Sequence, residues 1–318
     1  MNKTNEPIEF WIGFIAFIII MLLLDLFVFH KKNEVIKIKS ALLWSAFWIG
    51  LAILFNIGVY FVLGSQKALE FFTGYVIEES LSVDNLFVFI MVFAAFNIEA
   101  KHQHRILFWG IIGAIVMRGV FIYAGVALIE RFDWMMYVFG TFLLYTGIKM
   151  FFEKDKNESI DLENNKLLKF VKRFVPITVD DRDNPKFFRR IDGRLFATQF
   201  FLVLLMIEVS DLIFAVDSIP AVMAVSTDPF IIYTSNIFAI LGLRSLYFAL
   251  SGIMGYFRYL KYGLSFILAF IGLKMCINEL SAEMDWHFHI SIFASLSVII
   301  TILAASIVTS VIKIKKSA

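Results

Sequence analysis

The sequence predicts an all-α, polytopic membrane protein with about nine transmembrane helices. Of its 318 residues, 60% are hydrophobic and 18% are charged, whereas soluble proteins are about 45–50% apolar and about 25% charged. The chain also contains nine apolar runs, each close to or above the length of about 20 residues that spans a hydrocarbon core. Basic residues gather in alternate connecting segments. These three observations exclude a disordered chain, a fibrous repeat and a typical water-soluble enzyme.

The apolar runs give the expected helices in chain order. They lie at about 8–29, 41–64, 68–96, 106–129, 134–152, 195–223, 230–255, 262–279 and 288–312. The third and sixth runs exceed the spanning length, so we expect them to tilt or break. The first run is too long for the apolar core of a cleaved signal peptide, and Lys31 and Lys32 follow it instead of small residues.

Lysine and arginine positions predict the orientation of the chain. The segments that follow runs 1, 3, 5, 7 and 9 hold most of the basic residues, and the long polar segment 153–194 holds the largest share. The opposite side has Lys3, Lys67 and Arg131. We therefore expect the N-terminus outside and the C-terminus in the cytoplasm. Segment 153–194 is then a cytoplasmic linker that is partly helical or disordered.

Four landmarks recur in the same order in two parts of the chain, which indicates an internal repeat of three helices. The matching pairs are Val83–Leu86 with Val216–Ile219, Glu78 with Asp211, Arg118 with Arg244, and Lys149 with Lys274. Because three is odd, the second copy enters the membrane from the opposite side. Inverted pairs of this kind recur in secondary transporters, whose substrate sites lie between the copies near the bilayer midplane.

The repeat divides the chain into five parts. These are 1–67 with the first two helices, 68–152 with the first copy, 153–194 as the loop, 195–279 with the second copy, and 280–318 with the last helix and a cytoplasmic tail.

Acidic residues are concentrated inside the expected spans, where each charge is costly to bury. The seven are Asp25, Glu78, Glu79, Asp84, Glu208, Asp211 and Asp217. All except Asp25 lie on the third and sixth spans. Arg118 and Arg244 are the bases best placed to pair with them. The surplus of negative charge therefore predicts bound cations or protons.

The spacing of these acids constrains the two helices that carry them. Six residues separate Glu78 from Asp84, which is about 9 Å of rise and leaves the two side chains about 120° apart around a helix. Either the third and sixth spans are central helices surrounded by protein, or they are broken near the motif. Pro220 favours a break in the sixth span, because it would leave the carbonyl of Val216 without a backbone donor.

The oxygen atoms near these acids predict a site for a hard divalent cation. Carboxylate, amide and hydroxyl oxygens suit magnesium, calcium or manganese. No histidine or cysteine lies near the two motifs, which argues against zinc, copper or an iron–sulfur cluster. The candidate ligands are Glu78, Asp84, Asn85, Glu208, Asp211, Asp217 and Ser218.

Five further charged residues are candidate counter-ions or gating groups. They are Arg118, Arg244, Glu79, Lys149 and Lys274. We expect the two arginines to act as counter-ions rather than ligands, since a cation site repels a guanidinium that faces it. Glu79 has no counterpart in the second copy, and either lines the cavity or carries a proton. The two lysines lie near opposite membrane faces and could simply extend their ammonium groups to the surface.

At these residues the sequence resembles the TerC family of integral membrane proteins, and within it the Alx-type members, described as membrane-bound redox modulators and linked to manganese export. The matching segments are 74–85 (GYVIEESLSVDN), 208–221 (EVSDLIFAVDSIPA), 226–230 (STDPF), 235–244 (SNIFAILGLR) and 260–263 (LKYG). The resemblance implies about nine helices, an inner-membrane location and manganese efflux. It also favours Glu78 over Glu79 as the functional acid.

These observations lead to an expected function. We expect a secondary transporter, not an enzyme, that exports a divalent cation, with manganese(II) implied by the resemblance and calcium acceptable to the ligands alone. Its partners would be the lipid bilayer, the cation and protons, with no resident cofactor. A formal net charge of +2 predicts no nucleic-acid partner. The sequence leaves the oligomeric state open.

Two other functions compete with cation export. The first is a membrane-bound redox modulator or redox-linked accessory protein. It would need an electron carrier, and the chain has a single cysteine, Cys276, with no haem-ligand pair or nucleotide motif. The second is a passive ion channel or a non-transporting partner of other envelope proteins.

Overall fold

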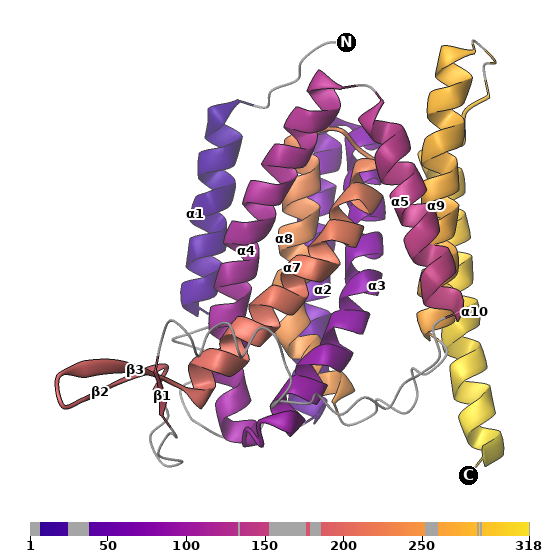
Figure 1. Ribbon diagram of the computed structural model, residues 1–318. Helices are drawn as coiled ribbons and strands as arrows, with labels where there is room; N and C mark the ends of the chain where they lie inside the picture. The colour runs from indigo at the N-terminus through magenta and orange to yellow at the C-terminus, as the bar shows by residue number, and fades with distance from the viewer. Residues whose placement is uncertain are drawn as a thin grey trace.

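Figure 1 shows the computed structural model of the protein, a bundle of long helices with a small β-sheet beside one end. The structure describes residues 7–24, 38–132, 134–152, 176–178, 186–251, 260–284, 286 and 288–317. Asp25, the last residues of the first and seventh expected spans, and most of the expected loop 153–194 lie outside the described residues.

The described elements follow the predicted order closely. They are α1 (Ile8–Leu24), α2 (Ile38–Leu63), α3 (Ser65–Ala95), α4 (Ala100–Arg131), α5 (Met135–Phe152), β1 (Ile177–Thr178), β2 (Phe188–Ile191), β3 (Arg194–Thr198), α7 (Gln199–Met223), α8 (Pro229–Leu250), α9 (Leu260–Glu283) and α10 (Ile292–Ser317). The nine helices that the structure describes confirm the all-α class of the bundle.

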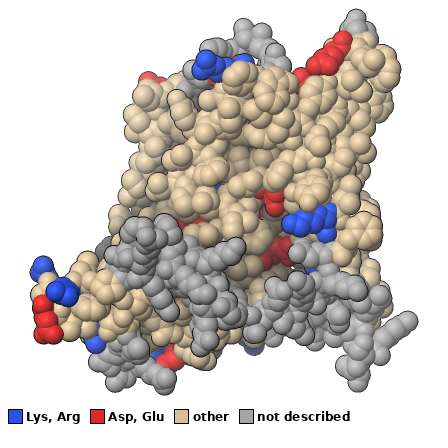
Figure 2. Space-filling view, in the orientation of Figure 1, with Lys and Arg blue, Asp and Glu red and all other residues tan. Residues whose placement is uncertain are grey.

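Length and composition make this a multi-pass membrane protein. Seven described helices are long and apolar enough to cross a membrane, namely α2, α4, α5, α7, α8, α9 and α10. Helix α1 is strongly apolar but has 17 residues. Helix α3 has 31 residues, which is long enough to span, but it carries Glu78, Glu79 and Asp84 and is not among these seven. Most of the flank seen in Figure 2 is without charged side chains, as a lipid-facing surface should be, apart from one group of acidic and basic side chains to the right of its centre.

The structure corrects the start of the sixth span. Residues 194–198 form strand β3, which pairs in parallel with β1 and antiparallel with β2, and α7 begins at Gln199. Asp192 and Gly193 join β2 to β3 with φ angles of 47° and 76°. Two positive φ values in a two-residue connection match the twist of paired strands, so this turn favours a hairpin over an early helix start.

The structure also corrects the expected break at Pro220. Helix α7 is continuous from Gln199 to Met223 and contains Pro220. The proline leaves the carbonyl of Val216 without its usual backbone donor, yet the helix continues for another turn, and Ala224 N donates to the carbonyl of Pro220 at 3.0 Å. The helix most enclosed by its neighbours is α8, which is buried along nearly its whole length.

Helices from the two halves of the chain pair across the bundle in a regular pattern. Helix α3 packs on α7 and α8, α4 packs on α7 and α8, and α5 packs on α9. Exchanging α3, α4 and α5 for α7, α8 and α9 turns the α3–α8 pair into the α4–α7 pair and leaves the other three pairs unchanged.

The closest helix pair, α5 with α9, depends on glycine. A Cβ atom added to Gly147 would lie 2.6 Å from the backbone nitrogen of Ala269 and 2.7 Å from the carbonyl oxygen of Ser265. A Cβ on Gly272 would lie 2.6 Å from the backbone nitrogen of Leu144. No real side chain fits at such distances. Small residues allow the two backbones to touch, as in other membrane helix pairs.

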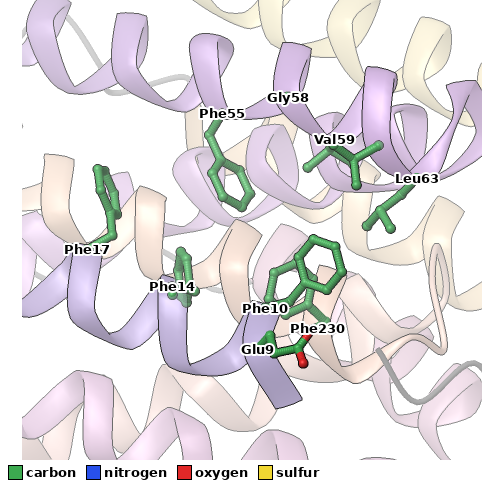
Figure 3. Close-up of a pocket in the computed structure, with 11 residues that line it drawn as sticks. Glu9, Phe10, Phe14, Phe17, Phe55, Gly58, Val59, Leu63 and Phe230 are labelled. Carbon is green, nitrogen blue, oxygen red and sulfur yellow. The ribbon is translucent and has the colours of Figure 1, made fainter. Parts of the chain in front are cut away.

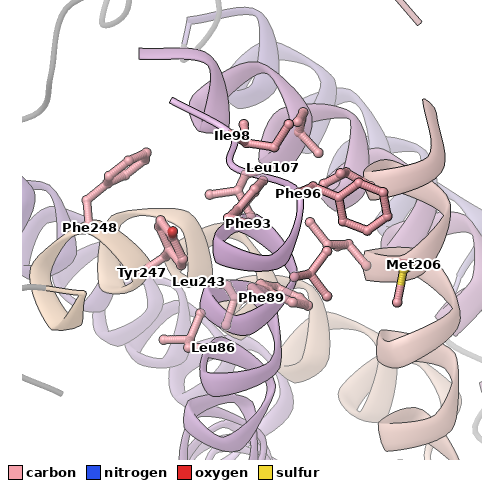
Figure 4. Packing of buried hydrophobic residues seen from close by; sticks show 14 of the residues in the cluster. Leu86, Phe89, Phe93, Phe96, Ile98, Leu107, Met206, Leu243, Tyr247 and Phe248 are labelled. Atoms are coloured by element: carbon pink, nitrogen blue, oxygen red, sulfur yellow. The ribbon is translucent and has the colours of Figure 1, made fainter. Parts of the chain in front are cut away.

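A cluster of buried aromatic and aliphatic side chains fills the end of the bundle nearest the β-sheet. Figure 4 shows Phe89 and Phe93 of α3 facing Leu243 and Tyr247 of α8, with Met206 of α7 on the other side. The rings of Phe93 and Tyr247 meet edge to face at 5.6 Å between centroids. This packing fixes α3 between α7 and α8 and so positions the polar side chains further along α3.

An apolar groove of about 500 Å³ lies between α1 and α2, away from those polar side chains. Figure 3 shows Phe14 of α1, Phe55 of α2 and Phe230 of α8 among its walls, with Glu9 at one end. Its lining offers little besides apolar contact, so the candidate functional site lies elsewhere.

Candidate functional site

The centre of the site is the guanidinium of Arg118, which α4 places in the interior of the bundle with no exposed surface. Its Nη1 donates to Glu78 of α3 and to the Asn236 side-chain oxygen of α8, the latter at 2.9 Å. Its Nη2 and Nε donate to the two carboxylate oxygens of Asp211 of α7, at 3.0 and 3.3 Å. One cation therefore joins four helices.

Neutral side chains complete this centre. Asn85 donates to Asp211 Oδ1 at 3.2 Å, and Ser218 accepts from Arg118 Nη1 at 3.4 Å. Asn85 lies seven residues after Glu78, and Ser218 lies seven residues after Asp211. The later residue of α3 thus contacts the earlier residue of α7, while Glu78 and Ser218 share one nitrogen of Arg118. Helices α3 and α7 therefore run antiparallel through the site.

The centre holds acceptor atoms that its own hydrogen bonds leave unused. Within the described part of the chain, no group donates to Glu78 Oε2 or to Asn85 Oδ1, although both atoms are buried. Two carboxylates also face a single guanidinium. Because a buried oxygen without a donor is costly, both atoms are suited to bind a cation, and the Glu78 carboxylate is also suited to take up a proton.

A cavity of about 240 Å³ adjoins the centre on the side of the β-sheet end. Asp84 and Asp217 line it together with Glu78, Asn85 and Ser218. Thr146 of α5 donates to Asp217 Oδ1 at 3.4 Å. Lys149 near the end of α5 and Lys261 near the start of α9 also line the cavity. Asp84 and Asp217 thus lie on the approach to the centre rather than in its ion pairs.

A second cavity, of about 600 Å³, lies at the other end of the bundle. Its walls come from the start of α3, the end of α7, the end of α9 and the start of α10. Lys274 lines it, is 2% exposed, and donates to the carbonyl oxygen of Ala224 at 3.4 Å. Lys149 and Lys274, the two lysines of the repeat, therefore belong to cavities at opposite ends.

The remaining candidates lie apart from the centre. Glu208 and Arg244 line a small void of about 20 Å³ with Asp211, and the Glu208 carboxylate lies against the backbone of Gly113. The Glu79 carboxylate lies near Gly242 of α8.

The seven predicted ligands therefore do not meet at one point. Four of them, Glu78, Asn85, Asp211 and Ser218, surround Arg118, two line the adjoining cavity, and Glu208 lies beyond Asp211. Among the described residues, no three acidic, histidine or cysteine side chains are grouped as a metal centre. The arrangement that the structure shows is a charged centre closed around Arg118.

Sequence reasoning missed three residues of the site: Asn236, Thr146 and Lys261. Asn236 carried a signal, because an amide in the middle of the apolar run 230–255 must find a partner. In the structure its oxygen accepts from Arg118, and its nitrogen donates to the carbonyl of Ile232 at 3.0 Å. Thr146 and Lys261 carried none, since a hydroxyl in a span and a lysine at its end are common.

Comparison with known proteins agrees with this architecture. Residues 63–318 match the model of the integral membrane protein TerC family. An uncharacterized membrane protein of Myxococcus xanthus is 50% identical over 95% of this chain and 92% of its own length. Proteins named "Putative membrane-bound redox modulator Alx" are 43% identical in Photorhabdus laumondii, over 98% of this chain and 97% of theirs, and 43% identical in Escherichia coli, over 97% and 95%. No solved structure matches. The chain belongs to the TerC family of integral membrane proteins.

Proposed function

We propose that this protein is a secondary transporter that exports a divalent cation, foremost manganese(II), in exchange for protons. The observation that carries the proposal is the pair of buried carboxylates, Glu78 and Asp211, held on antiparallel helices by one guanidinium. Two acids around a single base bind Arg118 when the site is closed. They can bind a divalent cation if Arg118 moves aside, or protons when the cation leaves.

The adjoining cavity supplies a route to this centre. Asp84 and Asp217 face the 240 Å³ space that opens from the centre toward the β-sheet end. In the proposed orientation this end is cytoplasmic, because the basic segments lie there. A cation would enter between these two carboxylates and pass inward to Glu78. Oxygen ligands of this kind suit manganese, magnesium and calcium alike, so the choice of manganese rests on the family resemblance.

An inverted repeat would explain how the site reaches both sides of the membrane. The exchange pattern of helix pairs, the antiparallel course of α3 and α7, and the placement of Lys149 and Lys274 in opposite cavities all agree with it. Rocking of one copy against the other would then close one cavity and open the other.

The name of the relatives supports a second candidate, a redox modulator. An electron carrier bound by the purified protein would show a visible flavin or haem spectrum, which the transporter proposal does not require. A passive channel is a third candidate, and it would move cations without regard to a proton gradient.

Flux through proteoliposomes tests the three candidates together. Manganese(II) and calcium uptake would be measured with and without a proton gradient for the parent protein, Asp211→Asn and Glu130→Gln. Glu130 is exposed at the end of α4, away from the site, so its variant is the matched control. We expect gradient-driven manganese flux in the parent and in Glu130→Gln, and none in Asp211→Asn. Flux that ignores the gradient would support a channel, and no flux in the parent would refute transport.

A further inference from the structure

The β2–β3 hairpin is the one described segment that projects sideways from the bundle. Figure 1 shows it reaching beyond the helices at the end opposite the start of α1, and Figure 2 shows basic and acidic side chains at its tip. Strand β3 ends at Thr198 and α7, a candidate membrane span, begins at Gln199. Because no linker separates them, the hairpin starts at the level where α7 enters the membrane.

The root of the hairpin is fixed to the bundle. Phe188 of β2 packs on Phe201 of α7 with 4.6 Å between ring centroids. The guanidinium of Arg105 on α4 lies 5.4 Å from the centre of the Phe187 ring. Thr198 donates from its backbone to the carbonyl of Phe187 at 3.1 Å. The direction of the hairpin is therefore set by α4 and α7, and its tip extends outward over the space beside the helices.

The composition of the hairpin combines positive charge with exposed apolar surface. Segment 186–198 contains Lys186, Arg189, Arg190 and Arg194 against a single acid, Asp192. Arg190 and Arg194 are exposed. So are Phe188, Ile191 and Leu195, by 42%, 37% and 57%. In water these exposed apolar side chains are unfavourable, whereas at a membrane surface they can be buried among lipid chains.

We propose that the β2–β3 hairpin binds acidic phospholipids of the leaflet at this end of the bundle. Arginines would contact the phosphate and acidic headgroups, while the apolar side chain of the face turned to the bilayer, Leu195 or Ile191, would insert among the upper acyl segments. Basic and apolar residues together are what interfacial segments use to bind anionic membranes. The hairpin lies at membrane level and points sideways along the surface, which favours lipid over a soluble partner. This proposal does not depend on cation transport.

The register of the strands explains how one hairpin makes both kinds of contact. Arg190 pairs with Leu195, and Ile191 pairs with Arg194. Residues directly opposite each other in an antiparallel pair share a face of the sheet, so each face carries an arginine beside an apolar side chain. Either face turned to the bilayer can therefore offer charge to headgroups and an apolar side chain to the acyl layer.

A spin label on the hairpin tests the proposal in the full-length protein. The label is attached to Leu195→Cys in a Cys276→Ala background, and the protein is placed in nanodiscs of phosphatidylcholine, with or without phosphatidylglycerol. We expect phosphatidylglycerol to shield the label from a water-soluble nickel relaxant and to expose it to oxygen dissolved in lipid. Each arginine near an anionic surface is worth about fivefold in binding. Arg190→Gln with Arg194→Gln should therefore shift the lipid-contacting population about 25-fold toward water.

Matched variants separate charge from other effects. Replacing the same two arginines with lysine keeps the charge and should keep the label in lipid. Arg131→Gln, at the opposite end of the bundle, should change nothing. A label equally exposed to water in both lipid mixtures would overturn the proposal, because the hairpin would then not contact the membrane. A label equally buried in both mixtures, and unaffected by the glutamines, would also overturn it, because acidic headgroups would then play no part.

Discussion

The guanidinium of Arg118 and the carboxylate of Asp211 form two parallel hydrogen bonds, of 3.0 and 3.3 Å, although 93 residues separate them in the chain. Such a fork-to-fork pair fixes the orientation of both groups as well as their distance. Glu78 binds the third nitrogen of the same guanidinium. The pair thus sets the relative position of α4 and α7, and any cation that enters must compete with Arg118 for both acids.

Asp84→Asn should reduce manganese transport by at least about tenfold, or 1.4 kcal/mol, while the protein still folds. Asp84 lines the cavity but makes none of the ion pairs with Arg118, so its amide removes charge from the route and leaves the centre intact. Transport rate in proteoliposomes and metal affinity by calorimetry measure the effect, with Glu130→Gln as control. Unchanged transport with normal protein yield would show that the ion does not pass Asp84.

Arg118→Ala should destabilise the fold more than it alters ion preference. Removing one partner of a buried ion pair costs about 3–5 kcal/mol, because the other partner stays buried without compensation. Thermal unfolding in detergent and protein yield report this loss, and Arg131→Ala, on the exposed last turn of the same helix, is the control. Adding Glu78→Gln to Arg118→Ala should restore part of the stability. A stable Arg118→Ala protein with changed metal preference would contradict the counter-ion role.

Gly147→Leu should prevent the pairing of α5 and α9. Overfilling a packed core costs about 1–3 kcal/mol, and here the new side chain meets backbone atoms that cannot move aside. Size-exclusion chromatography of the purified protein should show loss of the monodisperse species. Gly50→Leu is the matched control, since a Cβ on Gly50 meets nothing within 4 Å. Equal yields of the two variants would mean that the pair tolerates separation.

Two variants of Asp228 should separate its two contacts. Asp228 caps α8 through Oδ1, which accepts from Phe230 N at 3.0 Å, and its Oδ2 lies 2.8 Å from Lys67 Nζ. Asparagine keeps the cap. Because Lys67 is partly exposed and keeps Glu70 at 3.3 Å, Asp228→Asn should cost about 1 kcal/mol or less. Asp228→Ala also removes the cap, so it should lower the free energy of unfolding by a further amount of about 0.5–2 kcal/mol, which is typical for the loss of an N-cap side chain. Equal unfolding temperatures for both variants would show that the cap contributes little.

Hydropathy predicted the helices well, because a membrane span must be apolar over most of its length and a run of apolar residues can be read directly from the sequence. The repeat landmarks likewise pointed to Glu78, Asp211 and Arg118, which the structure brings together. Tertiary packing decided the rest. Which acids face Arg118 depends on how α3 and α7 are rotated. The sequence grouped Asp84 and Asp217 with the other candidate ligands, because the six-residue spacing alone could not show that they line the adjoining cavity instead. The enclosure of α8, and with it the role of Asn236, follows from its neighbours rather than from its own apolar pattern.

The β2–β3 hairpin shows the limit of hydropathy more directly. Its strands are short, and β3 merges into the apolar run that continues as α7. A window that averages over a span cannot separate them. The Asp192-Gly193 turn was the local signal, since two residues with positive φ favour a two-residue hairpin.

The distance along the chain between α5 and α9 has a consequence for biosynthesis. Helix α5 ends at Phe152 and its main partner begins at Leu260, so α5 enters the bilayer long before the ribosome has made the helix it packs on. Arg118 and Glu78 lie on the adjacent helices α4 and α3, and their pairing reduces the cost of inserting each charge. Asp211 arrives later with α7. A nascent chain that pauses after α5 therefore contains half of the residues of the charged centre, and the glycine face of α5 has no partner yet. Correct folding then requires that no other helix pack on this face before α9 has been synthesised.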